Sequence, residues 1–287
     1  MISMAVFLVL FSGITHAVWN LFTKRSLNKY VFLWSIHIVG TLALLPYFII
    51  ELLQVELHTE TLVYMAISAL FQGSYFIFLS KSYSYGDLSQ TYPIMRGTGV
   101  MLVTLLSVVL FGDSLTLVGW LGFCCIIVGL FIISGIVNRH ANQGKTTHSI
   151  SILYAIVVGM CVAGYTLMDK LIVQQLSPLS TLELSNINYV IVAFFMVIRA
   201  GRAQIIREWQ ENWKMILIGC ICSPASYFMF LMAMRLAPLA SIAPIREIGT
   251  VVGTILGILV LKEKQGVRRI IMSAVITCGI ISIAIWG

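Results

Sequence analysis

Apolar segments about 20 residues long follow one another from end to end of this 287-residue chain, with short polar connections between them. A helix of this length crosses the ~30 Å hydrocarbon core of a lipid bilayer. Apolar residues make up 59% of the chain and charged residues 10%, whereas soluble domains have about 45–50% and about 25%. This composition excludes a soluble enzyme and predicts an all-α polytopic membrane protein.

The positions of the apolar runs predict ten membrane-spanning segments. The longest polar stretch, Asn138 to His148, divides them into five and five. It predicts a first repeat over 1–137, a cytoplasmic loop over 138–149 and a second repeat over 150–287. The ten segments cover 3–23, 30–50, 61–82, 88–111, 115–136, 150–172, 178–199, 213–234, 238–261 and 267–286.

Lys and Arg are distributed unevenly between the connections. Of the 18 such residues, 14 lie in connections that follow odd-numbered segments, and only Lys170 and Arg235 follow even-numbered ones. Because basic loops stay in the cytoplasm, this predicts cytoplasmic odd connections and both termini outside. The formal charge of +7 is thereby explained without a nucleic-acid partner. Short connections favour a plasma-membrane protein, specifically one of a bacterial inner membrane, with an organellar membrane as the alternative.

The two halves of the chain match each other in sequence. A shift of 150 residues pairs Arg96 with Arg246 and Gly99 with Gly249. Because each half has an odd number of segments, the two copies must be inverted relative to each other in the bilayer. Inverted repeats build many transporters, with the substrate held near the midplane. Shifts of 146 and 152 residues match Gly13 with Gly159 and Tyr75 with Tyr227.

The chain also resembles a known family over essentially its whole length. It is similar to the ten-span EamA branch of the drug/metabolite transporter superfamily in its two five-segment units and its Ala17-Val-Trp19-Asn20 pattern. The proline-bearing segments four and nine, which end near Asp113 and Glu263, fit the same family. The resemblance implies a basket of ten helices, with segments 1, 3, 4, 6, 8 and 9 around a central cavity and segments 5 and 10 at the periphery.

Two matched motifs place a proline and an arginine inside apolar segments: Tyr92-Pro93-Ile94-Met95-Arg96 and Ala243-Pro244-Ile245-Arg246-Glu247. Proline removes a backbone N–H, and a guanidinium at membrane depth is costly unless it is paired or hydrated. Each arginine lies ~12 Å from the start of its segment, close to the middle of the bilayer. Because proline and arginine are both energetically unfavourable inside a membrane-spanning segment, their presence in both motifs indicates a function at this depth.

Two cations at one level repel each other unless an anion lies between them. We therefore predict that Arg96 and Arg246 bind a carboxylate, phosphonate or phosphate group, which arginine can bind bidentately. In the structural alternative, Glu247 or Glu183 neutralises Arg246, while Arg96 snorkels or bonds carbonyls freed near Pro93.

Glu247 is the acidic candidate for the site. Its side chain diverges from that of Arg246 by ~100° around the helix, so the two need not pair. It could carry a coupling proton, or alternatively form a salt bridge that locks segments together. Asp169 and Glu183 lie near the outer ends of their segments and are expected to be interfacial.

Further side chains are candidates for the cavity wall and for gating. Aromatic faces suit the organic part of a ligand and polar tips orient it, although ordinary packing is the alternative for each. Predicted substrate-binding residues are Trp19, Asn20, Tyr75, Tyr92, Tyr165 and Tyr227, in addition to Arg96, Arg246 and Glu247. Predicted coupling or gating residues are His16, Lys170, Pro93 and Pro244, with Glu247. A histidine in a helix bundle is also commonly just hydrogen-bonded, which applies to His16 and His37.

These features predict a secondary transporter of a small organic metabolite, amino-acid-like or otherwise anionic, that works by alternating access. Its partners would be the solute, the bilayer and a coupling proton. A flippase for a lipid-linked head group would use the same fold. A membrane-embedded enzyme is the other class, but the sequence has no HExxH or GxSxG motif and no carboxylate-rich metal cluster. We expect no enzymatic activity, metal or cofactor.

Overall fold

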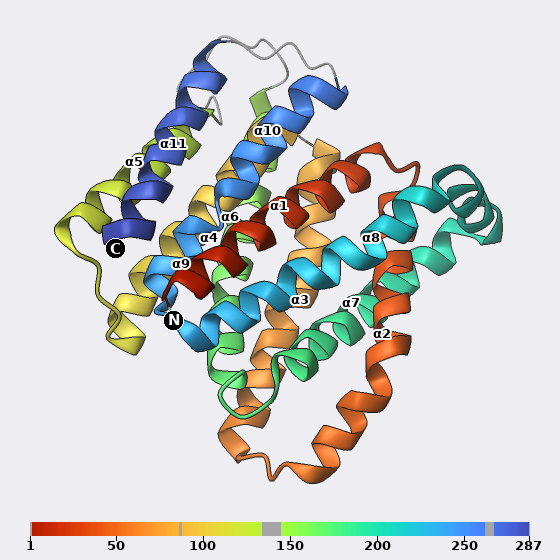
Figure 1. The fold of residues 1–287 in the computed structure, drawn as a ribbon. Helices are drawn as coiled ribbons and strands as arrows, with labels where there is room; N and C mark the ends of the chain where they lie inside the picture. The colour runs from red at the N-terminus through yellow and green to blue at the C-terminus, as the bar shows by residue number, and fades with distance from the viewer. Residues whose placement is uncertain (1, 86–87, 134–144, 262–266, 287) are drawn as a thin grey trace.

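The structure is a computed structural model that describes residues 2–85, 88–133, 145–261 and 267–286 (Figure 1). Over these residues it contains helices and no strand, which confirms the predicted all-α class. The helices are α1 (Ile2–Arg25), α2 (Lys29–Gln54), α3 (Thr59–Tyr85), α4 (Leu88–Phe111), α5 (Leu117–Ile133), α6 (Lys145–Ile172), α7 (Pro178–Ala200), α8 (Arg202–Leu236), α9 (Leu239–Ile245), α10 (Ile248–Leu261) and α11 (Val267–Trp286).

Seven of these helices are long and apolar enough to cross a membrane, and 117–132 and 271–286 form shorter apolar helices. The predicted loop is shorter than expected at its far end, because α6 already begins at Lys145. Residues 138–144 of that loop, and Glu263, lie outside the described part of the chain.

Helix α8 begins eleven residues before the predicted segment and has a non-helical residue, Asn212, inside it. The added turns are polar and lie before the kink. They are stabilised by an exposed ion pair between Arg207 and Glu211, whose Nε and Oε1 atoms are 2.8 Å apart. Buried Glu208 also accepts a hydrogen bond from the backbone N–H of Asn28 at 2.7 Å. The periodicity of apolar residues could not predict this polar helical turn.

The predicted ninth segment is two helices, α9 and α10, because the chain breaks at Arg246 and Glu247. Pro244 has no N–H to donate and cannot continue a regular helix. The break is a tight turn in which the N–H groups of Glu247 and Gly249 donate to Pro244 and Arg246 at 3.0 and 3.1 Å. Helix α4, by contrast, runs through position 93 without a break. The two matched proline motifs therefore differ in backbone structure.

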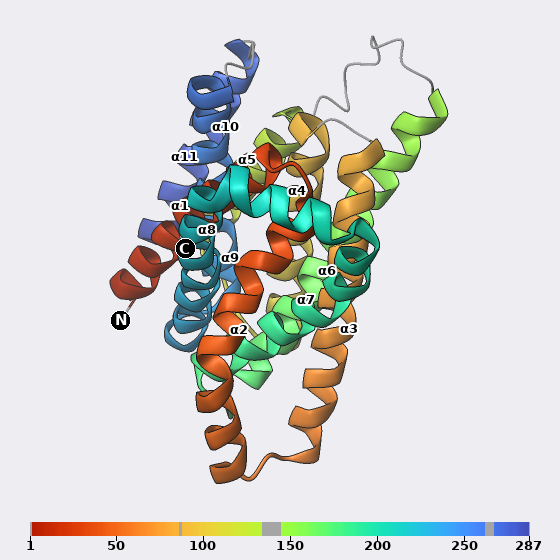
Figure 2. The same ribbon diagram turned by 90° about the vertical axis from the view of Figure 1, so that its right-hand side faces the viewer.

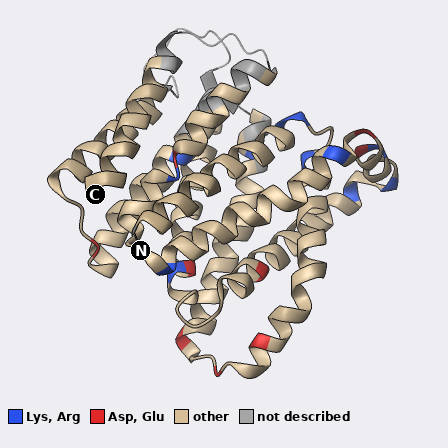
Figure 3. Ribbon diagram, viewed as in Figure 1, with Lys and Arg blue, Asp and Glu red and all other residues tan. Residues whose placement is uncertain are grey.

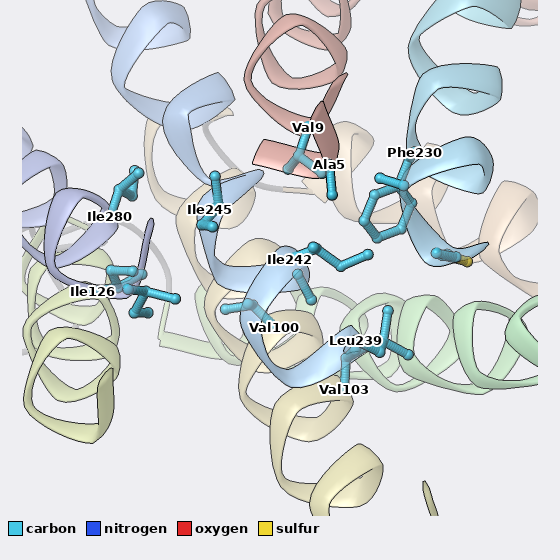
Figure 4. Packing of buried hydrophobic residues seen from close by; sticks show 14 of the residues in the cluster. Ala5, Val9, Val100, Val103, Ile126, Phe230, Leu239, Ile242, Ile245 and Ile280 are labelled. Atoms are coloured by element: carbon cyan, nitrogen blue, oxygen red, sulfur yellow. The ribbon is translucent and has the colours of Figure 1, made fainter. Parts of the chain in front are cut away.

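Buried apolar side chains surround α9 (Figure 4). Around it lie side chains from α1, α4, α5, α8 and α11, which form one apolar cluster. At its start, the carboxylate of Asp113 accepts a hydrogen bond from the N–H of Ala240 at 3.0 Å. The residues labelled in the figure are Ala5, Val9, Val100, Val103, Ile126, Phe230, Leu239, Ile242, Ile245 and Ile280. This packing fixes the position of the break that follows α9.

The helix contacts repeat when the two halves of the chain are exchanged. Helix α1 packs against α8 and α10, and its counterpart α6 packs against α3 and α4. Helix α2 packs against its counterpart α7, and α5 against α11 at one edge of the bundle (Figure 1).

Glycines permit the closest of these contacts. A Cβ atom on Gly249 would lie 2.7 Å from the carbonyl oxygen of Gly13, and one on Gly159 would lie 2.9 Å from that of Met95. Glycine at such positions lets helix backbones touch. The sequence match of Gly13 with Gly159 is thus reflected in equivalent packing.

Charges separate along the bundle. Lys and Arg gather where α1 ends and α8 begins, together with Glu208 and Glu211 of α8 (Figure 3). The acids Glu51, Glu56 and Glu60 lie around the α2–α3 connection, which has no Lys or Arg. In Figure 2 this connection lies at the bottom of the molecule, and the start of α8 lies well above it. The basic end is the one that we predict to face the cytoplasm.

Candidate functional site

A cavity of about 60 Å³ lies among the helices, lined by residues of α1, α2, α3, α6, α7, α8 and the turn after α9. Its wall is mostly aromatic and aliphatic, with a few polar groups and one arginine, which is typical of a small-molecule site. The wall consists of His16, Trp19, Leu33, His37, Tyr75, Phe76, Leu79, Tyr165, Leu182, Ser185, Asn186, Tyr189, Ser223, Pro224, Ser226, Tyr227 and Arg246.

Among the described residues, Arg246 is the only lysine or arginine in this wall, and it is 6% exposed. Its Nε donates to Oγ of Ser12 at 3.1 Å, and Nη2 lies 3.5 Å from Oγ of Ser226. Its Cζ lies 4.3 Å from the centre of the Phe230 ring, a cation–π contact. Within the described residues it makes no salt bridge.

The two serines are themselves fixed by backbone bonds. Ser12 donates its hydroxyl to the carbonyl of Ser226 at 2.6 Å, and Ser226 donates to the carbonyl of Ser12 at 2.8 Å. Their oxygen lone pairs therefore face Arg246, but neither serine carries charge. Because a buried charge without an opposite charge is unfavourable, this guanidinium is suited to bind an anion that enters the cavity.

Arg96 is in a different situation. Its Nε donates to Oε2 of Glu247 at 3.2 Å, and Nη2 forms a second, closer bond to Oε1. Oε2 of Glu247 also accepts from the hydroxyl of Thr250 at 3.0 Å. The pair joins α4 to the turn between α9 and α10, so it connects the two halves of the chain. This is the salt-bridge alternative for Glu247, although its partner is Arg96 and not Arg246.

Aromatic rings form one continuous side of the cavity. Ring centroids of Tyr75 and Tyr165 lie 5.9 Å apart and those of Tyr165 and Tyr227 lie 6.3 Å apart, both edge-on. Tyr189 lies 6.3 Å from Tyr75. The buried Nε1–H of Trp19 has no hydrogen-bond partner within the described structure. It offers a donor to a ligand.

The predicted site residues divide into two groups. Those in the cavity wall are His16, Trp19, Tyr75, Tyr165, Tyr227 and Arg246. Those outside the wall are Asn20, Tyr92, Arg96, Lys170, Pro244 and Glu247. Asn20 lines a smaller adjoining cavity, which shares Trp19 with the central one. The side chain of Pro93 lies outside the described part of the structure.

Lys170, a gating candidate, contacts the end of α8. Its Nζ donates to the carbonyl oxygens of Met234 and, at 3.4 Å, Ala237. A lysine at this place satisfies carbonyls that a helix C-terminus leaves unpaired. In this structure Lys170 holds α6 and α8 together.

The expectation that Asp169 and Glu183 are interfacial is wrong. Both are 0% exposed. Position near a helix end did not reveal this, because neighbouring helices cover both side chains from the side. Asp169 accepts hydrogen bonds from Ser68 at 2.5 Å, from Gln72 at 3.3 Å and, more closely, from Tyr227.

Sequence reasoning also missed the contribution of α7 to the cavity. Four residues of this helix lie in the wall: Leu182, Ser185, Asn186 and Tyr189. Their spacing of three, four and seven residues places them on one helix face. Polar side chains on one face of an apolar segment were the signal that could have identified them.

The fold and the cavity define a polytopic helical membrane protein with a cavity among its helices. The chain belongs to the EamA-like transporter family, within the drug/metabolite transporter superfamily. The family matches residues 3–135 and 149–285, once in each half of the chain. This confirms the family resemblance that the motifs indicated and identifies the chain as a membrane transporter of this type.

A solved structure described only as "Crystal structure of protein" has a similar fold. The TM-score is 0.73 at 12% sequence identity, and the match covers 98% of this chain and 96% of that chain. At this identity the similarity concerns the fold alone.

Proposed function

We propose that this chain is a secondary transporter for a small organic solute that carries an anionic group, and that Arg246 binds that group. The observation that supports this proposal is a buried guanidinium in the cavity wall whose hydrogen-bond partners are neutral serines. A carboxylate or phosphonate that enters the cavity would supply the missing negative charge.

The rest of the solute would lie against the aromatic side of the cavity. Tyr75, Tyr165 and Tyr189 offer apolar ring surface, and the unpartnered Nε1–H of Trp19 offers a hydrogen bond. Such a wall suits an amino-acid-like solute, whose carboxylate would bind Arg246 and whose side chain would contact the rings.

Transport would occur by alternating access between two inverted five-helix repeats, which together comprise ten membrane-spanning segments. The exchange symmetry of the helix contacts and the two matches to the family support this arrangement. The break between α9 and α10 lies where the repeats meet, as broken helices do in other transporters built from inverted repeats. We place the protein in the plasma membrane of a bacterium, with its basic end in the cytoplasm.

A binding test with small anions examines the proposal directly. Purified protein would be titrated with benzoate, methylphosphonate, L-alanine and inorganic phosphate, with tetraphenylphosphonium as a cationic control. A ligand that binds only the folded state stabilises it, by about 2.7 kcal/mol at 100 times Kd. We expect at least one anionic probe to stabilise the wild type and to lose this effect in Arg246→Gln.

Arg207→Gln is the matched control, since it removes an arginine that is exposed and does not line the cavity. It should leave the response to the anion intact. Stabilisation by the cation alone, or an equal anion response in Arg246→Gln, would contradict the proposal. Flux of the stabilising probe into liposomes then separates transport from enzymatic turnover, which would consume the probe without moving it.

A further inference from the structure

Asp169 on α6 is a buried carboxylate that the anion site does not use. It is 0% exposed, and it makes no salt bridge with any Lys, Arg or His that the structure describes. Its hydrogen-bond donors are all neutral: Ser68, Gln72 and Tyr227. A carboxylate in a site of low dielectric constant is costly to keep charged without a cation, and binding a proton removes that cost.

Among the described residues, the helices around Asp169 supply no positive charge that forms a salt bridge with its carboxylate. Helix α3 contributes Ser68 and Gln72, and Gln72 also donates to Ser185 of α7 at 2.9 Å. The neighbouring Lys170 extends to the carbonyl oxygens at the end of α8. The titratable or charged groups around Asp169 are Tyr165 and Lys170 on α6, Tyr189 on α7 and Tyr227 on α8.

Tyr227 connects Asp169 to the anion site. Its hydroxyl donates to Oδ2 of Asp169, while its ring centre lies 5.8 Å from Cζ of Arg246. The preceding residue, Ser226, accepts a hydrogen bond from Arg246. The same turn of α8 therefore contacts both the buried acid and the buried cation, so that the charge of one influences the other.

We propose that Asp169 is a proton-binding site coupled to the anion site: one proton binds its carboxylate when an anion occupies Arg246, and leaves when the anion leaves. This inference rests on the proposed function. The proton comes from solution and returns to solution, and no covalent bond other than O–H forms or breaks. An anion at Arg246 adds negative charge beside the acid, which favours the protonated form.

Glu247 was the residue predicted from the sequence to carry a coupling proton. Its carboxylate already binds Arg96 through two hydrogen bonds, so its negative charge is compensated. Asp169 has no such compensation among the described residues. The structure therefore favours Asp169 for this role.

Infrared difference spectroscopy of the full-length protein tests proton binding without any ligand. We expect a carbonyl band of a protonated carboxylic acid that appears as the pH falls and is absent in Asp169→Asn. In Tyr227→Phe the band should remain but shift, because one hydrogen bond to the acid is lost. The band should also remain in Glu183→Gln, which removes another buried carboxylate. A band unchanged in Asp169→Asn would overturn the proposal.

Calorimetry with benzoate, which stays ionised throughout the pH range used, tests the coupling. If one proton binds with each anion, linkage makes the wild-type affinity fall by up to ~10-fold per pH unit as the pH rises. We expect a proton uptake close to one per benzoate in the wild type and in Glu183→Gln. In Asp169→Asn the affinity should become independent of pH and the uptake should vanish.

The outcomes separate the two proposals. Benzoate binding that depends on Arg246 but keeps its proton uptake in Asp169→Asn would overturn the role of Asp169 and leave the anion site standing. If benzoate, methylphosphonate, L-alanine and inorganic phosphate all fail to bind the wild type, both proposals are overturned. A merely structural role for Asp169 predicts lower stability without loss of the pH dependence.

Discussion

The ion pair between Arg96 and Glu247 should be one of the strongest single links between the two halves of the chain. Glu247 has a side-chain exposure of 1% and Arg96 one of 13%, so both charges are largely removed from solvent. Removal of one partner of a buried pair leaves the other charge uncompensated, at a cost of about 3–5 kcal/mol. Since Arg96 retains some exposure, we expect about 3 kcal/mol for Glu247→Gln.

A double-mutant cycle isolates the pairwise contribution. The variants are Arg96→Gln, Glu247→Gln and the double variant, and their unfolding is followed with denaturant in detergent or lipid. If the residues interact directly, the double variant should lose clearly less than the sum of the two single losses, with a coupling of about 2 kcal/mol. The double variant leaves neither charge of the pair without its partner, which is why its loss should be limited.

The exposed pair of Arg207 and Glu211 provides a matched control within the same protein. Its side chains are 70% and 49% exposed, and the two residues are one helical turn apart. Pairs of this kind couple by about 0.3–0.5 kcal/mol. Additive losses at Arg96 and Glu247, or a coupling as small as that of the control pair, would refute the view that this ion pair is buried and stabilising.

Two further predictions concern packing and orientation. Gly249→Ala should destabilise the protein or displace α1, because the new Cβ would lie 2.7 Å from the carbonyl oxygen of Gly13. Gly253→Ala, with no atom within 4 Å of its Cβ position, should be tolerated. The thermal unfolding midpoints of the two variants test this difference, and equal midpoints would contradict the close packing of α1 on α10. In a background without the six native cysteines, a cysteine at Leu27 should react with a membrane-impermeant reagent only from the cytoplasmic side. A cysteine at Glu56 should react only from outside, since the two positions flank opposite ends of α2. The reverse labelling pattern would overturn the orientation.

The sequence was sufficient for the all-α class and for the position of most helices. Apolar runs of spanning length located the helices, and matched residues such as Gly13 and Gly159 indicated contacts that the structure repeats. The helix boundaries that the sequence predicted wrongly lie in polar stretches of the chain. Helix α6 extends to Lys145 and α8 to Arg202, because polar turns can be helical without any apolar periodicity.

The pairing of the charged residues could not be predicted in the same way. The distances of Arg96, Arg246 and Glu247 from the starts of their segments predict that they lie at one level, but they do not predict which side chains face each other. That depends on the break after Pro244, which turns the Glu247 carboxylate toward α4 and leaves Arg246 with Ser12. Asp169 was misjudged for a related reason, since distance along a helix says nothing about cover from neighbouring helices.

Residues that match in the two repeats thus carry different parts of the chemistry. Arg96 holds an internal carboxylate and connects the halves, while its counterpart Arg246 hydrogen-bonds neutral serines and faces the cavity. A transport cycle that had to separate Arg96 from Glu247 would meet a barrier of about 3–5 kcal/mol, which slows a step by roughly 10²–10³-fold or more. We therefore expect the turn after α9 to move together with α4 as one unit. The side of the cavity that opens and closes would then lie among α1, α3 and α8. Their hydrogen bonds with Arg246 and Asp169 are made by the neutral side chains of Ser12, Ser68 and Tyr227, and such bonds are less costly to exchange.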